Sequence, residues 1–299
     1  MPNPVQPSSD PPYCGRFAPS PTGALHFGSL VAAFGSFLRA RSQVGRWLVR
    51  VEDIDGPRTV PGAAAAQLET LRRFGLIWDG EVMFQSHRAD AYEAALQRLR
   101  EVGALFSCRC SRTVLAERGG IHRGDCGGSG DGMAALRVPA PDMSIGFTDA
   151  IRGHFSQNLS QDAGDFVVRR ADGLYAYQLA VVVDDAAQGI TEVVRGADLL
   201  DSTPRQLHLQ TLLGLPHSAY AHLPLVLDEA GHKLGKSQQA LALDEDDPIP
   251  ALRHAWQFLG QNPAMLPSGT NVERLITAAI TTFDLARVPA RDIALSTLP

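Results

Sequence analysis

Disulfide-forming residues, excess positive charge and long apolar runs are all scarce in this chain of 299 residues. Four cysteines are too few for the disulfide framework of a chain this long. No apolar run approaches the roughly 18 to 20 residues that a membrane-spanning helix needs. Residues 1–12 are polar and proline-rich, without the basic-then-apolar pattern of a signal peptide. We therefore expect a cytoplasmic protein with a flexible leader over residues 1–12 and no membrane partner.

The charge balance excludes a polycation. The net charge is -5 and the isoelectric point is about 6.0, so any contact with a nucleic acid must come from a local basic patch. This makes a DNA-binding protein less expected but leaves room for an enzyme that acts on RNA. Hydrophobic residues make up 44% of the chain, enough to bury a sizeable core.

The first part of the chain alternates between strand and helix patterns. Residues 13–18 and 47–54 read as strands, and apolar residues recur at helical spacing over 30–38. Helices are expected over 63–74 and 89–102. This order is typical of a doubly wound α/β layer, so the predicted fold class is α/β and Rossmann-like.

The middle of the chain changes in texture. Residues 107–132 are rich in Cys, Gly, Arg and Ser, and only short strand-like pieces follow, at 135–138 and 165–169. We interpret 89–170 as an insertion that splits the Rossmann-like domain into residues 13–88 and 171–244.

Further elements are expected after the insertion. The predicted strands are an apolar run of buried-strand length over 175–183, then 190–195 and 223–227. A helix begins at Thr203 with a capping hydroxyl and proline in its first turn, and stops at Gly214. Residues 245–299 form a helical, loop-rich tail.

A Pro/Gly-rich loop at residues 19–29 carries the first candidate site. It lies between a predicted strand and a predicted helix, where backbone N–H groups and the helix dipole favour phosphate. Gly28 permits close approach of a nucleotide, and His26 can donate a hydrogen bond to a phosphate oxygen. Taken alone, the string fits equally well a βα loop with an incidental histidine.

A second candidate site lies at residues 232–237. Lys233 and Lys236, beside Ser237, can hold the phosphates of ATP as charge moves onto the leaving pyrophosphate. The alternative is a solvated basic loop, the usual setting of two lysines.

Together the two strings resemble the H-I-G-H and K-M-S-K-S signatures of class I aminoacyl-tRNA synthetases. The strings RFAPSPTG (16–23), RVEDID (50–55), YQLAVVVDD (177–185) and VRGAD (194–198) are similar to those of glutamyl-tRNA synthetases. The resemblance covers about residues 13–240. Here Leu234 and Gly235 replace the usual Met and Ser, and Ser29 stands at the fourth position of the first signature. The few residues after Ser237 leave no room for an anticodon-binding domain, so the resemblance is closest to glutamyl-Q tRNA(Asp) synthetases, a family of truncated paralogues.

The resemblance implies roles for individual residues. A glutamate pocket would be formed by Arg16, Phe17, Ala18, Pro19, Ser20, Glu52, Tyr177 and Arg195. Glu52 would hold the substrate ammonium, and an arginine fork suits a dicarboxylic substrate. ATP would be bound by His26, Gly28, Lys233, Lys236 and Ser237, with His26 and Lys236 the catalytic pair. Without the resemblance, Glu52 and Arg195 also fit a strand-end ion pair, and Tyr177 a core residue.

Three clustered cysteines point to a metal. Cys108, Cys110, His122 and Cys126 offer three thiolates and one imidazole, enough for a closed, structural zinc site. In the resembling family a tyrosine is typical at the place of His122. The alternative is three unpaired thiols that hold no metal.

The function implied by the resemblance is ATP-dependent activation of L-glutamate, with Mg²⁺, and its transfer to the queuosine base of tRNA(Asp). A monomer is expected. Three alternatives remain at this point: a minimal synthetase that charges a tRNA 3′ end, a small-molecule nucleotidyltransferase, and a non-catalytic zinc-containing RNA-binding paralogue. The basic residues Arg152, Arg169 and Arg170 are candidates for the RNA-facing surface, or a solvated face.

Overall fold

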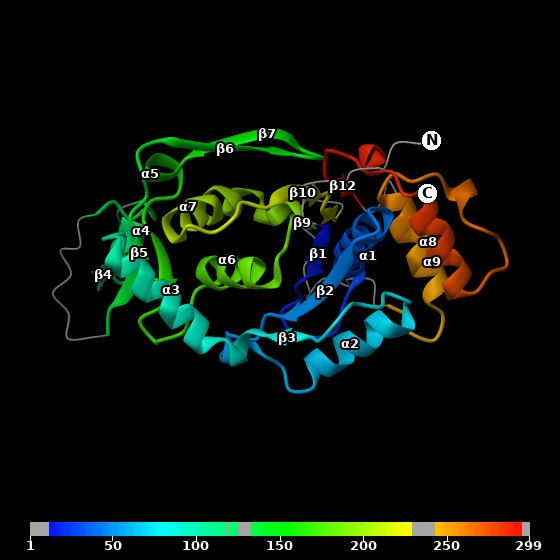
Figure 1. Cartoon of the computed structure of the whole chain (residues 1–299), viewed down its shortest axis with the longest axis horizontal. Helices are drawn as coiled ribbons and strands as arrows, with labels where there is room; N and C mark the ends of the chain where they lie inside the picture. Colours follow the sequence, from blue (N-terminus) through cyan, green and yellow to red (C-terminus); the bar gives the residue numbers. More distant parts are fainter. Residues whose placement is uncertain (1–11, 118, 125–132, 229–242, 295–299) are drawn as a thin grey trace, which may run out of the picture.

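Parallel strands lie at the centre of the molecule, with helices on both sides (Figure 1). Residues 89–170 form an arm that extends from this body and ends in a small antiparallel sheet. This computed structural model describes residues 12–117, 119–124, 133–228 and 243–294. The strands are β1 (Cys14–Phe17), β2 (Arg46–Val51), β3 (Met83–Phe84), β4 (Phe106–Cys108), β5 (Ala135–Val138), β6 (Ser144–Asp149), β7 (Gly153–Asn158), β8 (Phe166–Arg169), β9 (Glu192–Gly196), β10 (Ala219–Leu223), β11 (Val226–Leu227) and β12 (Ile293–Ala294).

The α-helices are α1 (Phe27–Ser42), α2 (Ala63–Arg73), α3 (Ala89–Glu101), α4 (Arg112–Glu117), α5 (Leu159–Asp162), α6 (Tyr177–Gln188), α7 (Thr203–Leu213), α8 (Pro248–Phe258) and α9 (Val272–Thr282). Short 3₁₀ turns lie at Gly56–Arg58, Gln85–His87, Ala197–Ser202, Pro263–Met265 and Leu285–Arg287. No helix in the described ranges is long and apolar enough to cross a bilayer.

Two groups of strands meet between β1 and β9. One sheet has the order β1-β2-β3 with parallel neighbours, and the other has the order β7-β6-β10-β9, in which β9, β10 and β6 are parallel. They adjoin where the Thr191 amide donates to the Cys14 carbonyl oxygen at 2.9 Å. From β1 the chain adds β2 and β3 on one side, and later β9 and β10 on the other side. The strand order therefore reverses at the β1–β9 junction, which is the topological switch point of the fold.

Helix α1 is the centre of the main hydrophobic core. Leu30, Phe34 and Leu38 are fully buried, and the helix contacts β1, β2 and β9 as well as α8 and α9, so it is covered on more than one side. The core continues into the C-terminal segment, where Trp256 of α8 and Leu275 of α9 are also buried. The predicted helical tail is thus confirmed over its described part, and it packs on α1 (Figure 1).

The second core joins the insertion to the rest of the chain. Tyr92 and Leu96 of α3 pack with Leu179 and Val182 of α6 and with Leu209 of α7. The β6–β7 hairpin extends from the arm toward the central strands, where β6 pairs with β10 at Asp149 and Tyr220. The segment 89–170 therefore contributes side chains and a strand to the same body as residues 171–228.

The apolar run at residues 175–183 is a helix, so the predicted strand is wrong. Helix α6 is buried on most of its surface, by α3, β8 and α7, and an all-round buried helix has the same continuous apolar pattern as a central strand. Its length distinguishes the two, because the helix continues through Asp184 and Asp185 to a left-handed cap at Gly189 (φ 67°).

Two smaller expectations also differ from the structure. The predicted strand over 223–227 is two strands, since Pro224 and Leu225 separate β10 from β11. The helix at Thr203 begins without a side-chain cap, and the Thr203 hydroxyl instead accepts a hydrogen bond from Arg195 at 2.9 Å. The helices predicted over 63–74 and 89–102 and the strands over 135–138 and 165–169 are confirmed within about one residue.

Candidate active site

A cavity opens at the carboxyl ends of β1 and β9. This is where open α/β sheets bind their ligands, because strand direction and crossover geometry leave a crevice at the switch point. Its volume is about 1210 Å³, above the roughly 300–1,000 Å³ typical of one small-molecule ligand. The wall includes Phe17 to Ser20 after β1, Glu52 after β2, Gly196 and Leu199 after β9, and Leu223 to Val226 around the end of β10.

His26 caps the helix that faces this cavity. Its Nδ1 accepts a hydrogen bond from the Ser29 amide at 3.3 Å, which places the proton of the neutral ring on Nε2. Gly28 lies under the ring, since a Cβ there would meet Cε1 and Nδ1 of His26 at 3.2 and 3.3 Å. Both residues line the cavity together with the first turn of α1. The loop thus combines a donor with a helix N-terminus, the setting that binds phosphate.

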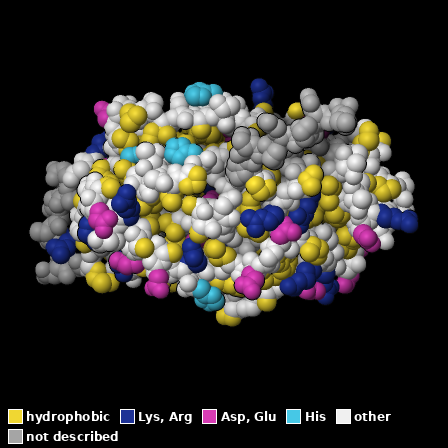
Figure 2. Space-filling view, in the orientation of Figure 1, with side chains coloured by type: hydrophobic (Ala, Val, Ile, Leu, Met, Phe, Trp, Pro, Cys, Tyr) yellow, Lys and Arg dark blue, Asp and Glu magenta, His cyan; other side chains and the backbone are white. Residues whose placement is uncertain are grey.

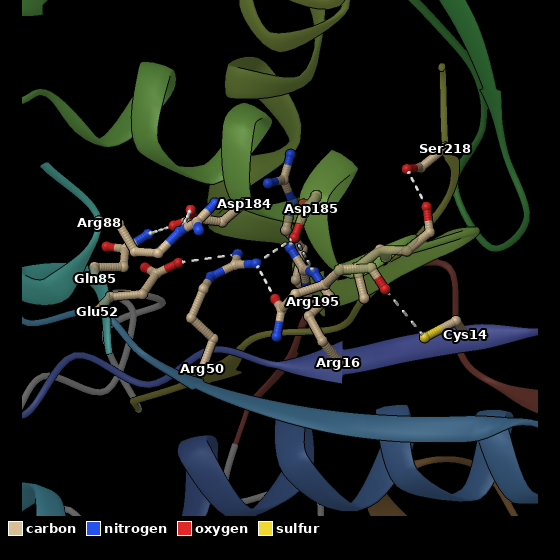
Figure 3. A network of polar contacts seen from close by, with 12 residues as sticks. Cys14, Arg16, Arg50, Glu52, Gln85, Arg88, Asp184, Asp185, Arg195 and Ser218 are labelled. Carbon is tan, nitrogen blue, oxygen red and sulfur yellow. Dashed lines mark hydrogen bonds and ion pairs between the residues drawn. The ribbon is translucent and has the colours of Figure 1, made fainter. Parts of the chain in front are cut away.

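A buried ion network supports the floor of the site (Figure 3). Arg16 from β1 and Arg50 from β2 converge on Asp185 of α6, with the shortest contact at 2.6 Å from Arg50 Nη1. Arg50 also contacts Glu52 at 3.3 Å. Burial opposes ionisation of Asp185, but Arg16 and Arg50 outweigh it and lower the pKa of this carboxyl. Burial raises the pKa of Glu52, although Arg50 and Arg16 act against the rise.

Arg195 has a different environment. Its side chain donates to His222 Nε2 at 3.1 Å, the Tyr177 hydroxyl at 3.3 Å, Thr203 Oγ1 at 2.9 Å and the Leu199 carbonyl oxygen at 3.3 Å. All four acceptors are neutral, and among the described residues no carboxylate contacts this guanidinium. Arg195 is only 5% exposed, so its positive charge is buried and has no carboxylate in direct contact among the described residues.

Most of the predicted glutamate-pocket residues come together in the structure. Phe17, Ala18, Pro19, Ser20, Glu52 and Tyr177 all line the cavity, as do His26 and Gly28 of the predicted ATP site. Arg16 and Arg195 lie behind its wall, at 3% and 5% exposure. The predicted phosphate-binding residues Lys233, Lys236 and Ser237 lie outside the described residues.

Three predicted metal ligands cluster at the end of the arm, beside the small antiparallel sheet. Ligand atoms of Cys108, Cys110 and His122 lie within 4.8 Å of one another. The sulfur atoms are 3.3 and 3.8 Å from His122 Nε2, close to the roughly 3.6 Å between sulfur and nitrogen ligands on one tetrahedral zinc. The fourth predicted ligand, Cys126, lies outside the described residues.

Asp165 orients the histidine of this cluster. Its Oδ2 accepts from His122 Nδ1 at 2.8 Å, which turns Nε2 toward the thiols. The backbone amides of Gly124 and Ala140 donate to the same carboxylate at 2.6 and 2.8 Å. A carboxylate on the outer nitrogen of a ligating histidine is the usual support of a zinc site, so these residues fit the metal. Cys110 also lines the cavity.

Three residues that the structure places in these sites have no signal in the sequence. Asp149 and His222 contact each other across 73 residues, and Asp165 lies 43 residues from His122. A single sequence carries no trace of such pairings, whereas the cysteines were visible because two of them share a short spacing.

The basic residues of the arm have acidic partners. Arg152 contacts Asp292, Arg169 contacts Glu93, and Arg170 contacts Asp172 and Asp55. On the face seen in Figure 2, Lys and Arg side chains alternate with Asp and Glu, in keeping with the net charge of -5. Of the three, only Arg170 lines the cavity.

Comparison with known proteins decides the family. A sequence profile of the catalytic domain of class I tRNA synthetases (E and Q) matches residues 14–126 and 125–278. The chain belongs to this family. Among relatives in the family, the glutamyl-Q tRNA(Asp) synthetase of Xanthomonas oryzae is 57% identical over 280 residues, 93% of each chain. That of Pseudomonas fluorescens is 50% identical over 94% of this chain and 95% of its own. The resemblance read from the sequence is therefore confirmed.

Solved structures in this synthetase family share the fold. The glutamate–tRNA synthetase of Elizabethkingia anophelis superposes with a TM-score of 0.80 at 25% identity, over 95% of this chain and 68% of its own. The glutamate tRNA ligase of Elizabethkingia meningosepticum, solved with its amino acid, gives 0.79 at 24% identity and 67% of its own length. The predicted class I synthetase catalytic fold is thereby confirmed.

Proposed function

We propose that this class I tRNA synthetase is a ligase that activates L-glutamate with ATP and transfers it to queuosine in the anticodon of tRNA(Asp). The choice of amino acid and acceptor follows the names of relatives that are 49–57% identical over nearly the whole chain. The chemistry is argued from the residues around the cavity.

One observation carries the choice of a dicarboxylic amino acid. Arg195 is a buried guanidinium held by four neutral acceptors, while the neighbouring Arg16 and Arg50 have Asp185 as counter-ion. A buried charge is stable only when it is paired, so Arg195 favours an incoming anion. Tyr177 lies on the cavity wall, and its hydroxyl accepts a hydrogen bond from Arg195. The side-chain carboxylate of glutamate would therefore bind at Tyr177 and Arg195. Glu52 lines the same cavity and would take the substrate ammonium.

The first reaction step forms glutamyl-adenylate. The α-carboxylate oxygen attacks the α-phosphorus of ATP, the new O–P bond forms, and the bond to the leaving pyrophosphate breaks. The Nε2–H of His26 donates to a phosphate oxygen as negative charge grows on it. Lys236, aided by Lys233 and Ser237, would neutralise the pyrophosphate. Mg²⁺ accompanies ATP as part of the substrate.

The second step needs little chemistry from the protein. A hydroxyl of the cyclopentenediol on queuosine attacks the activated carbonyl carbon, an ester forms, and AMP leaves with the bonding electrons. Positioning of the two reactants supplies most of the rate, because the mixed anhydride is already activated. The RNA substrate would be met in the cytoplasm, by a monomeric enzyme.

The cysteine cluster would hold one structural zinc ion. Cys108, Cys110 and His122 lie close enough to share one ion, and with Cys126 as the fourth ligand they would leave no open position for water. Asp165 fixes the imidazole for this purpose. The ion would order the end of the arm that borders the cavity at Cys110.

The deciding experiment uses labelled glutamate, ATP and Mg²⁺ with purified tRNA(Asp), with and without queuosine, and with tRNA(Glu). We expect label only on tRNA(Asp) that contains queuosine. Label on tRNA(Glu) would identify a minimal 3′-charging synthetase instead. Arg195→Gln should abolish labelling, while Arg274→Gln, at an exposed arginine on α9, serves as the control.

A further inference from the structure

A buried chain of three side chains leads from the β6–β7 hairpin to Arg195. His222 of β10 accepts from Arg195 Nε at its Nε2, at 3.1 Å, and its Nδ1 lies 2.6 Å from Asp149 Oδ2. His222 is fully buried and Asp149 is 2% exposed. The chain therefore connects a guanidinium, an imidazole and a carboxylate, in that order.

The bonds determine the tautomer of His222. An arginine Nε–H can only donate, so His222 Nε2 must present its lone pair. The ring proton of a neutral imidazole then resides on Nδ1 and is donated to Asp149. Burial lowers the pKa of His222, and Arg195 lowers it further against the opposing effect of Asp149, so the ring is neutral near pH 7.

Asp149 is itself locked in place by the backbone. Its Oδ1 accepts from the amides of Ile151 at 2.9 Å, Arg152 at 2.8 Å and His222 at 3.1 Å. With Oδ2 bonded to the imidazole, the carboxylate has a donor on each side. The side chain can rotate only by breaking the turn between β6 and β7, so it is a rigid support for His222.

We propose that Asp149 and His222 are positioning residues that hold the Arg195 guanidinium for the side-chain carboxylate of the amino-acid substrate. This inference rests on the proposed function and assigns its substrate selectivity to a residue of the insertion. The imidazole is essential to it. A carboxylate in direct contact with Arg195, like that of Asp185 with Arg16, would neutralise the guanidinium and repel the substrate carboxylate. A neutral imidazole orients the guanidinium and leaves its charge available to the substrate.

Asp149→Asn tests the proposal with little change in shape. The asparagine oxygen must remain at Oδ1, where three amides donate, so its NH₂ group faces His222 Nδ1. The ring then carries its proton on Nε2, opposite the Arg195 Nε–H, and two donors face each other. ¹⁵N NMR of the His222 ring should show the proton moved from Nδ1 to Nε2. We expect the KM for glutamate to rise about ten- to a hundredfold, with the KM for ATP unchanged.

A second pair of variants keeps the test decisive if Asp149→Asn does not fold. Gln at position 222 can offer an oxygen to Arg195, and Leu cannot. His222→Gln should therefore retain a lower KM for glutamate than His222→Leu. Arg152→Ala is the control for a loosened turn, since the Arg152 side chain bonds Asp292 and the backbone carbonyl oxygens of His222 and Leu223, and does not contact the imidazole. It should lower the melting temperature and leave the KM for glutamate unchanged.

The outcomes separate this inference from the proposed function. If the wild-type protein shows no glutamate-dependent exchange of pyrophosphate into ATP, the proposed function fails. If the wild type is active and Asp149→Asn moves the ring proton but leaves the KM for glutamate unchanged, the positioning role is wrong. An unmoved proton in the folded variant would overturn it as well.

Discussion

Asp185 forms ion pairs with two arginines, so its removal is expected to affect the stability of the folded protein strongly. Arg16 and Arg50 are both almost completely buried and both contact this single carboxylate. Removing one partner of a buried ion pair leaves an uncompensated charge in a medium that solvates it poorly.

Asp185→Ala is therefore expected to lower the free energy of unfolding by about 3–5 kcal/mol, because buried Arg16 loses its paired carboxylate and buried Arg50 is left with Glu52 alone. Urea unfolding followed by circular dichroism measures the change. Asp246→Ala is the control, since Asp246 is 98% exposed. A loss no greater than that of the control would show that Arg16 and Arg50 are solvated in the native state.

Gly28 supports His26 by having no side chain. A Cβ at this position would press on the His26 ring at 3.2 Å, so Gly28→Ala should displace the donor from the phosphate site. We expect pyrophosphate exchange to slow by about ten- to a hundredfold, the cost of a small misplacement in an oriented site, with little change in melting temperature. Gly56→Ala is the matched control, because a Cβ added there would meet no atom within 4 Å beyond its chain neighbours. Equal exchange rates in the two variants would mean that the His26 ring tolerates the added methyl group.

Short sequence motifs were enough to predict many of the residues that line the cavity. Contacts between residues far apart in the sequence could not be predicted in this way. The loop at 19–29 could be predicted because glycine, proline and histidine in that order restrict the backbone and offer a donor. Glu52 and Tyr177 came from resemblance to a family. The support given by Asp149 to His222 arises only when β6 lies beside β10, a pairing that local patterns do not encode.

Among the elements, the amphipathic helices α2 and α3 and the short strands β5 and β8 were predicted within about one residue. Helices α2 and α3 have one polar face, so their period is visible in the sequence. Helix α6 contains a continuous apolar run, Leu179 to Val183, most of which other elements bury, and this run resembles a central strand. The β6–β7 hairpin was missed for a related reason: its alternating strand SIGFTD is short and lies in a segment interpreted as an insertion.

The Cys/His cluster at the end of β4 gives a prediction at this scale. Asp165→Asn should weaken zinc binding about 10- to 100-fold, since the outer carboxylate orients His122. Competition with a zinc chelator measures the affinity. Asp142→Asn, at an exposed aspartate of the same arm, should leave it unchanged. Equal affinities in the two variants would mean that the histidine does not hold the ion.

Across the whole molecule, stability is expected to depend on pH through two histidines, the buried His222 and the half-buried His208. Burial lowers the pKa of both His208 and His222. The unfolded chain then binds more protons than the native one as the pH falls through about 6.5, so this part of the stability is present above that value and is lost below it.

The melting temperature should therefore fall between about pH 7.5 and pH 5.5. His208→Asn, outside the cavity, should make that fall smaller, because one of the two groups no longer titrates. His254→Asn replaces an exposed histidine on α8 and is the control. A fall of the same size in all three proteins would assign the pH dependence to other groups.

The path of the β6–β7 hairpin limits how this protein can be rebuilt. Replacing the arm, residues 89–170, with that of another synthetase would also replace Asp149, which contacts His222 and through it Arg195. We expect a chimera that loses this aspartate to bind glutamate more weakly, whatever its acceptor. Grafts that aim to alter the acceptor alone must carry the tip of this hairpin unchanged.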